Sequence, residues 1–268
     1  MVELLLELGR ELADAVFPRR CYLCGAGAPG GIACAQHALP AGLPGPRCGT
    51  CASALPGVVP GGALCAACRL RSPGFRALVA LADYRAQPVC RPWLFALKYG
   101  GRRDLGQPLG RALGEAWRER APREYRREPL FVPVPLHWKR RLERGYDQAR
   151  ALAVHAARAA AVPWEAVLVR RWATGVQGGP GAPSRAANVR GAFGPRRRFG
   201  LLPSGRRTPD LSGRHVWLVD DVVTSGATVA ECARTLRRCG AASVCVLAVA
   251  RAGTGGSGGA GAEVGWAP

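Results

Sequence analysis

Acidic residues are scarce in this sequence. It has 18 Asp and Glu against 38 Lys and Arg, which gives a formal net charge of +20 and a pI near 10.8. This surplus favours anionic partners, such as nucleic acid or phosphorylated metabolites, without naming a reaction. The 268 residues, 48% of them hydrophobic, suffice for one buried α/β domain and a small additional module. Two large domains are excluded by that length.

No stretch is long and apolar enough to cross a bilayer, so we expect no membrane span. The first residues also lack a basic start and a small-residue cleavage site, so we expect no signal peptide. Apolar residues recur there at helical spacing, at Leu4, Leu5, Leu8, Leu12 and Val16. They predict an amphipathic helix over residues 1–18. Its polar face is acidic, which favours docking on protein over binding to an anionic membrane.

Cysteine is nearly absent from the middle of the chain, where only Cys90 lies between Arg69 and Glu231. Most of the other cysteines form pairs with a two-residue spacing near the start: Cys21 and Cys24, Cys34 and His37, Cys48 and Cys51, and Cys65 and Cys68. Such pairs are typical of zinc ligands rather than disulfides, which indicates a reducing compartment and a cytoplasmic protein. Taken sequentially, they predict two tetrahedral zinc sites. The module is either a structural clip or a nucleic-acid reader.

The sequence has no Walker A motif and no Ser-His-Asp arrangement, so ATP hydrolysis and acyl transfer find little support. Instead, residues 216–228, VWLVDDVVTSGAT, join a predicted strand to a predicted helix. The strand carries Asp220 and Asp221 to the carboxyl edge of a sheet, where ligands bind. The free amides and positive dipole at the helix start attract phosphate, and carboxylates accept bonds from sugar hydroxyls. Ribose 5-phosphate matches both features; a plain helix cap is the alternative.

Short apolar runs alternate with helical patterns from about Phe75 onward. Strands are predicted at residues 77–82, 130–136, 167–170, 216–220 and 244–250, and helices at 93–99, 105–118, 146–161 and 226–239. The alternation predicts parallel strands joined by helices in an α/β domain over residues 75–252, behind a double zinc-binding module over residues 19–74. Residues 174–213 are dense in Gly, Pro and Arg and form a functional or disordered loop, and residues 253–268 a flexible tail.

The segment LVDDVVTSGAT resembles the phosphoribosyl pyrophosphate motif of type I phosphoribosyltransferases. Over nearly the whole chain, the sequence is similar to the ComF family of competence-associated, phosphoribosyltransferase-like proteins. The other matching pieces are FPRRCYLCG near the start, LKYGGRRDLG at 97–106, VPVPLHWKRRLERGYDQA at 132–149 and RAANVRGAF at 185–193. The resemblance implies a type I phosphoribosyltransferase fold, with a parallel sheet flanked by helices, behind an N-terminal zinc-ribbon-like module.

The resemblance also implies roles for individual residues. Asp220 and Asp221 bind the ribose hydroxyls, and the 5-phosphate lies among Thr224, Ser225, Gly226, Ala227 and Thr228. The pyrophosphate meets a loop made by Lys98, Tyr99, Gly100, Gly101 and Arg102. In that loop two glycines expose amides beside cations, with an ordinary helix C-terminus as the alternative. Arg185 matches a family motif that corresponds to a catalytic loop. In an enzyme, pyrophosphate is displaced at the anomeric carbon while Mg²⁺ neutralises the leaving group.

Two positions depart from the family patterns. His37 stands where ComF relatives usually have cysteine, so a partly lost first zinc site is an alternative. Thr224 stands where 6-oxopurine salvage members of the fold have an aspartate that serves as general base. Its absence speaks against that purine chemistry and leaves the acceptor open.

Cations and aromatic residues mix in residues 137–146, HWKRRLERGY, as they do in grooves that bind single-stranded DNA. Contacts with pyrophosphate or a solvated surface are the alternative.

Three hypotheses on the function of the protein follow from these features. The first is a ComF-like protein that binds phosphoribosyl pyrophosphate and supports uptake of single-stranded DNA in transformation. The second is a metabolic enzyme that transfers phosphoribose to a base or amine. The third is a non-catalytic ligand sensor whose zinc module contacts a helicase-like competence ATPase.

Overall fold

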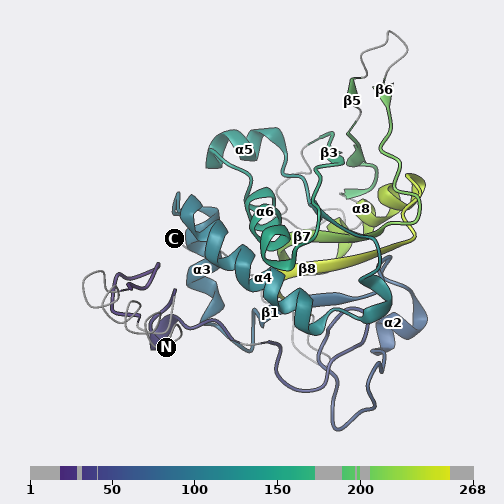
Figure 1. The fold of residues 1–268 in the computed structure, drawn as a ribbon. Coiled ribbons are helices and arrows are strands. Elements are labelled where there is room, and N and C mark those ends of the chain that lie inside the picture. The colour runs from purple at the N-terminus through teal and green to yellow at the C-terminus, as the bar shows by residue number, and fades with distance from the viewer. Residues whose placement is uncertain are drawn as a thin grey trace, which may run out of the picture.

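A four-stranded parallel sheet in the order β1-β8-β7-β2 forms the centre of the protein (Figure 1). Its strands are β1 (Leu78–Asp83), β2 (Pro129–Pro133), β7 (His215–Val223) and β8 (Ser243–Arg251). The computed structural model describes residues 19–28, 32–40, 42–172, 189–196, 198–199 and 206–253. The predicted N-terminal helix, Arg185 and most of the predicted tail lie outside these residues.

Helices cover both faces of the sheet. They are α3 (Cys90–Lys98), α4 (Gly106–Arg120), α6 (Gln148–Ala160) and α8 (Ala227–Arg238). Successive strand residues point to opposite faces, so Trp217 and Val219 pack in the layer of α4 and α6, whereas Val216 and Leu218 pack with α8. Because both faces are covered, β8 is buried at every position and is a nearly continuous apolar run in the sequence.

Helices α4 and α6 approach each other closely along a row of glycines. A Cβ atom added at Gly110 would lie 2.6 Å from the Cβ of His155, and one at Gly114 would lie 2.4 Å from the carbonyl oxygen of Ala156. Larger side chains would therefore push the two helices apart. Further along α4, Trp117 packs edge-on against Trp217 of β7, with ring centroids 6.0 Å apart. This packing fixes the helical layer against the strand that carries the acidic pair.

The strand predicted at residues 167–170 exists but does not continue the parallel sheet. It is β3 (Leu168–Arg170), which pairs antiparallel with β4 (Phe193–Pro195). The prediction of one parallel series was wrong here because Leu168 packs with Phe193 in the α8 layer, and the returning chain supplies the partner strand. A second antiparallel pair, β5 (Arg198–Phe199) and β6 (Arg206–Arg207), projects away from the sheet (Figure 1).

The remaining elements are short. They are η1 (Ala35–His37), α2 (Ala66–Leu70), η2 (Arg103–Leu105), η3 (Arg123–Tyr125) and α5 (Trp138–Arg144). Among the described residues, no helix has the length and apolar character needed to span a membrane. The predicted division of the chain near residue 74 stays a prediction.

Candidate ligand site and metal centres

The acidic pair lies near the carboxyl end of β7. The strand was predicted to end at Asp220, but it continues to Val223, because β8 extends equally far and pairs with it up to Arg251. Asp220 and Asp221 therefore lie within β7 rather than after it. Asp221 reaches α3 and forms an ion pair with Lys98, with 3.2 Å between Nζ and Oδ1. Both side chains of this pair are 13% exposed, which places the pair in a nearly dry environment.

The turn after β7 opens α8 as predicted. Gly226 is the N-cap residue in the left-handed region, with a φ of +79°, which glycine adopts without strain. The Ser225 hydroxyl accepts a long hydrogen bond of 3.4 Å from the amide of Ala227. The carboxylates do not cap the helix: Asp220 accepts from the Asp221 amide at 2.9 Å, and Asp221 pairs with Lys98. The plain-cap alternative thus leaves the acidic pair unexplained.

The end of α3 only partly matches its predicted form. The amides of Tyr99 and Gly100 donate to the carbonyls of Phe95 and Ala96, at 2.8 and 3.1 Å. The prediction that both glycines expose their amides was wrong, because the helix C-terminus uses the amide of Gly100. Gly101 follows in the left-handed region, with a φ of +63°.

Arg102 also differs from the prediction of a cation open to pyrophosphate. Its guanidinium forms two hydrogen bonds with the carboxylate of Asp104, at 2.9 and 2.6 Å. The Asp104 hydrogen bonds raise the pKa of Arg102, and Arg102 lowers that of Asp104. Both side chains are well exposed, so the pair costs little to open.

The basic segment around α5 packs beside the end of α3. Arg144 lies over the ring of Tyr99 at 5.0 Å, and Arg103 lies over the ring of Tyr146 at 5.7 Å. The Tyr146 hydroxyl donates to the carbonyl of Leu97, and burial raises the pKa of Tyr146 to about 12. Two motifs about 40 residues apart in the chain thus form one surface, which Lys98 joins to Asp221.

Asp220 has the most unusual electrostatic setting among these residues. Burial, followed by repulsion from Asp221, raises its pKa to about 8; Lys98 opposes this shift and Asp147 adds to it. Asp220 also interacts electrostatically with Arg170 of β3 and Cys232 of α8. A carboxyl group whose pKa is raised this far by burial, near the turn that opens α8, is more typical of a functional site than of a structural one.

The raised pKa of Asp220 predicts a pH-dependent stability. Between its unfolded value of 3.8 and about 8, the folded protein binds more protons at this site than the unfolded chain, so Asp220 lowers the unfolding free energy as pH rises. We expect Asp220→Asn to stabilise the protein at pH 8.5 more than at pH 5. Urea unfolding of both proteins at the two pH values measures this. An equal difference at both values would contradict the assignment.

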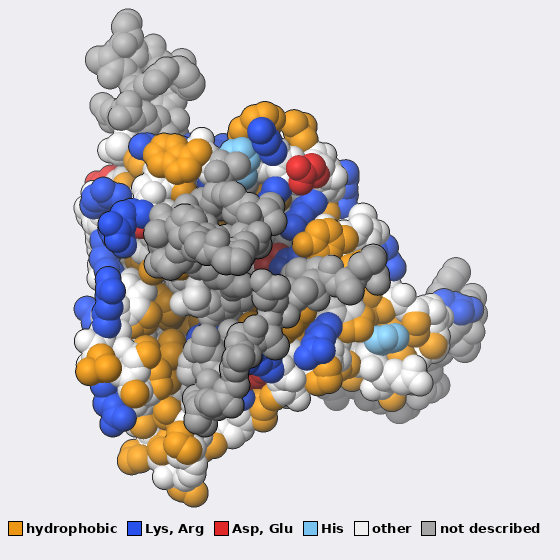
Figure 2. All heavy atoms as spheres, turned by 180° about the vertical axis from the view of Figure 1, so that it is seen from behind, with side chains coloured by type: hydrophobic (Ala, Val, Ile, Leu, Met, Phe, Trp, Pro, Cys, Tyr) orange, Lys and Arg blue, Asp and Glu red, His pale blue; other side chains and the backbone are white. Residues whose placement is uncertain are grey.

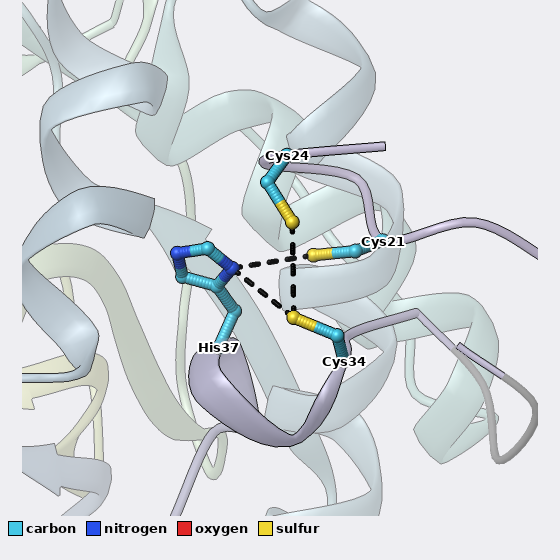
Figure 3. A group of neighbouring side chains, drawn as sticks. All are labelled: Cys21, Cys24, Cys34 and His37. Atoms are coloured by element: carbon cyan, nitrogen blue, oxygen red, sulfur yellow. Dashed lines mark hydrogen bonds between the residues drawn. The ribbon is translucent and has the colours of Figure 1, made fainter. Parts of the chain in front are cut away.

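The first predicted metal quartet comes together in the structure. Its sulfur and nitrogen atoms converge from Cys21, Cys24, Cys34 and His37 (Figure 3). Cys24 and Cys34 sulfurs are 3.7 Å apart, and Nδ1 of His37 lies 3.6 Å from the Cys21 sulfur and 3.3 Å from that of Cys34. A tetrahedral zinc ion with Zn–S bonds of about 2.3 Å requires ligand separations of about 3.5 to 3.8 Å. The donor set therefore fits zinc.

The second quartet also comes together, and it lies deeper. The ligand atoms of Cys48, Cys51, Cys65 and Cys68 lie within 4.8 Å of one another, and the Cys51 and Cys65 sulfurs are 3.6 Å apart. Burial raises the pKa of Cys48, but the amides of Cys51, Cys65 and Thr50 outweigh it and lower the pKa to about 7. A thiol already close to its thiolate form is suited to metal binding.

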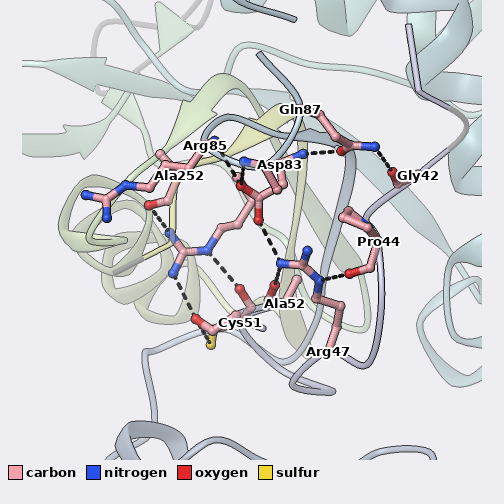
Figure 4. A network of polar contacts seen from close by, with 12 residues as sticks. Gly42, Pro44, Arg47, Cys51, Ala52, Asp83, Arg85, Gln87 and Ala252 are labelled. Atoms are coloured by element: carbon pink, nitrogen blue, oxygen red, sulfur yellow. Dashed lines mark hydrogen bonds and ion pairs between the residues drawn. The ribbon is translucent and has the colours of Figure 1, made fainter. Parts of the chain in front are cut away.

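A polar network attaches the second quartet to the carboxyl ends of β1 and β8 (Figure 4). Arg47 forms an ion pair with Asp83 at 2.8 Å, and Asp83 accepts from the amides of Arg85 and Ala86. Arg251, at the end of β8, donates to the carbonyl of Cys51 at 2.9 Å. No local pattern indicated a role for Arg251, because it is an isolated cation after an apolar run.

The chain is similar to known proteins in sequence and in fold. The phosphoribosyl transferase domain family matches residues 147–257. The chain is 33% identical over 189 residues to DNA utilization protein YhgH of Escherichia coli (strain K12), covering 70% of this chain and 77% of that protein. It is 30% identical over 211 residues to Competence protein F of Haemophilus influenzae, covering 77% and 85%. The allosteric regulatory enzyme of purine biosynthesis is a structural neighbour at 20% identity and a TM-score of 0.36, over 58% of this chain and 30% of that enzyme.

Proposed function

The chain belongs to the ComF family of competence-associated, phosphoribosyltransferase-like proteins, and from this premise we propose that it binds phosphoribosyl pyrophosphate with Mg²⁺ during the handling of single-stranded DNA. One observation carries the proposal. The ion pair of Lys98 and Asp221 joins the end of α3 to the strand that precedes the phosphate-binding turn. In one bound ligand, a ribose hydroxyl would contact Asp221 and the pyrophosphate group would contact Lys98.

In this proposal the acidic residues bind the sugar, and the turn and Lys98 bind the anionic groups. Asp220 and Asp221 accept hydrogen bonds from the ribose hydroxyls, while the turn from Thr224 to Thr228 surrounds the 5-phosphate with amides and hydroxyls. Lys98 then faces the pyrophosphate, where its charge is worth more than in water because the site is nearly dry. Bound Mg²⁺ supplies the remaining charge neutralisation of the pyrophosphate.

Calorimetric titration tests this assignment. We expect phosphoribosyl pyrophosphate with Mg²⁺ to bind more tightly than ribose 5-phosphate, because only the former offers an anion to Lys98. Absence of heat with either ligand would remove the proposal. Pyrophosphate release that depends on an added base or amine would favour the metabolic transferase, and tight binding without turnover would favour the sensor.

The surface beside the site supports the DNA part of the proposal. Trp138 and Tyr99 are 57% and 53% exposed, and Lys139 lies over the Trp138 ring at 5.6 Å. Exposed rings can stack on bases while nearby cations neutralise phosphates. On the face drawn in Figure 2, Lys and Arg side chains are far more frequent than Asp and Glu. Surfaces that bind single-stranded nucleic acid combine exposed aromatic rings with an excess of cations.

Neutralising Arg140, Arg141 and Arg144 to Gln should weaken single-stranded DNA binding and reduce the slope of log affinity against log salt by about 0.7 for each lost phosphate contact. Fluorescence anisotropy at several salt concentrations measures both. The matched control removes the same charge from three exposed arginines, Arg118 near the end of α4 and Arg123 and Arg127 before β2, on the amino-terminal side of the sheet. Equal losses of DNA affinity in the two triple variants would show a general charge effect. They would exclude the basic segment around α5 as a specific DNA-binding surface.

We extend the proposal to the organisation of the chain. The module of residues 19–74 acts as a structural clip on the domain of residues 75–252, in a protein that works in the cytoplasm. The polar network of Arg47, Asp83 and Arg251 supports the clip. A helicase-like competence ATPase remains a predicted partner of the zinc module, and co-purification with and without residues 19–74 tests it.

A further inference from the structure

Arg251 is a buried cation that contacts two different parts of the protein. Only 6% of the residue is exposed. Its Nε donates to the carbonyl of Cys51 at 2.9 Å, and its Nη2 donates to the Ser53 hydroxyl at 3.3 Å. Its Nη1 donates to the carbonyl of Val223 at 3.0 Å and to that of Thr224. One planar guanidinium thus holds the second quartet on one side and the start of the phosphate-binding turn on the other.

Each side of this contact belongs to a functional element. Cys51 is a member of the second quartet, and its sulfur lies 3.1 Å from the Ser53 hydroxyl. The same hydroxyl accepts a hydrogen bond from Arg251. Thr224 is the first residue after β7, and the turn that begins there leads to Gly226 and α8. A buried guanidinium that loses an acceptor leaves charged donors unsatisfied. A shift of the quartet therefore changes the energy of the turn, and a shift of the turn changes that of the quartet.

We propose that Arg251 is a positioning residue that couples metal loading of the second quartet to ligand binding at the phosphate-binding turn. The inference rests on the proposed function, because the coupled ligand is phosphoribosyl pyrophosphate. Zinc bound by the second quartet would fix the position of Cys51. The carbonyl of Cys51 accepts a hydrogen bond from the guanidinium of Arg251, which also donates to the carbonyls of Val223 and Thr224. Coupling between two sites is reciprocal, so the bound ligand must retain zinc as strongly as zinc favours the ligand.

A second arginine provides an internal control. Arg47 also ties the second quartet to the sheet, because it donates to the carbonyl of Ala52 at 3.4 Å and pairs with Asp83. Asp83 ends β1 beside Arg251 in the register of β1 and β8, but its side chain bonds with Arg47 and the amides of Arg85 and Ala86 rather than with the turn after β7. Removing Arg47 should weaken zinc retention but leave the coupling to the ligand intact.

The first experiment uses the wild-type chain. Zinc transfer to a chromogenic chelator is followed with and without saturating phosphoribosyl pyrophosphate, at constant Mg²⁺. We expect two phases of zinc release, of which Cys24→Ser removes the one that belongs to the first quartet. The ligand should slow the remaining phase about tenfold, within the range of common coupling factors. The first-quartet phase should keep its rate. Asp220→Asn with Asp221→Asn controls for chelation of zinc by free ligand.

The arginine variants then identify the residue that couples zinc release to ligand binding. In Arg251→Met we expect the ligand to have no effect on zinc release, and the ligand dissociation constant to rise about tenfold, because the carbonyls of Val223 and Thr224 lose a charged donor. Arg251→Lys should restore part of the coupling, since one ammonium can reach only some of the acceptors. Arg47→Met should release zinc faster with the same ratio between the two conditions. Should Arg251→Met not fold, Arg251→Lys and the wild-type rates carry the test.

The outcomes separate the inference from the proposed function. If calorimetry detects no binding of phosphoribosyl pyrophosphate, both are overturned. If the ligand binds and zinc release from the second quartet is unchanged, the coupling is overturned and the proposed function stands. A slowing that persists in Arg251→Met, or that disappears in Arg47→Met, assigns the coupling to other residues and overturns the role of Arg251.

Discussion

Replacing Asp220 and Asp221 together by asparagine should weaken binding of phosphoribosyl pyrophosphate by about a hundredfold or more. Each carboxylate would lose a hydrogen bond with a charged acceptor, worth about 1.5 to 3 kcal/mol, and two such losses give about 3 to 6 kcal/mol. Calorimetry at a pH near 8 measures the change. Asparagine keeps the size of each side chain, so the packing of β7 against β8 is preserved.

The two single variants should differ. Asp221→Asn removes the ion pair with Lys98, so one fewer carboxylate competes with pyrophosphate for that ammonium, which offsets part of the lost hydrogen bond. Asp220→Asn brings no such compensation, so it should have the larger effect. A control that removes two carboxylates from the exposed face of α4, Glu115→Gln with Glu119→Gln, should bind as the wild type does. Equal affinity of the double asparagine variant and the control would refute the sugar-binding role of the pair.

The sequence predicted much of the fold because local patterns and packing agree there. The run VCVLAVA is buried on both faces of a sheet and is apolar throughout, and it forms β8 as expected. The run VWLVDDVVTSGAT joins a strand to a helix, and its residues lie at the carboxyl edge that the motif requires. The spacing of two residues within each pair predicted the ligands, and the structure confirms the assumption that successive pairs converge into quartets.

Contacts between distant segments were not predictable in the same way. Leu168 has the pattern of a parallel strand, and only the returning Phe193 segment decides its antiparallel pairing. Gly100 has the residue type of an anion-binding loop, but its amide completes the C-terminus of α3. Arg251 donates to Cys51, which is 200 residues away in the chain, and no local pattern encodes such a contact. The link between the two predicted sites is therefore visible only in three dimensions.

Metal removal should have the largest effect on stability. We expect two zinc ions per chain by elemental analysis, because both quartets have ligand separations that fit a tetrahedral ion. Zinc can supply on the order of 10 kcal/mol to the folding of a segment with few core residues. Chelation should therefore lower the thermal midpoint of the whole chain. A content of one or none would reject the prediction of two sites.

The two quartets should contribute unequally. Cys48 and Cys51 pack in the core with Phe75 and Val223, whereas Cys24 is exposed. Cys51→Ser should therefore destabilise the chain much more than Cys24→Ser, although each variant loses one zinc ion. The control is Cys239→Ser, a half-buried thiol outside both quartets, which should keep two zinc ions and a thermal midpoint near that of the wild type. Equal losses of stability in the two ligand variants would mean that the attachment of the second quartet through Arg47 and Arg251 adds nothing to the fold.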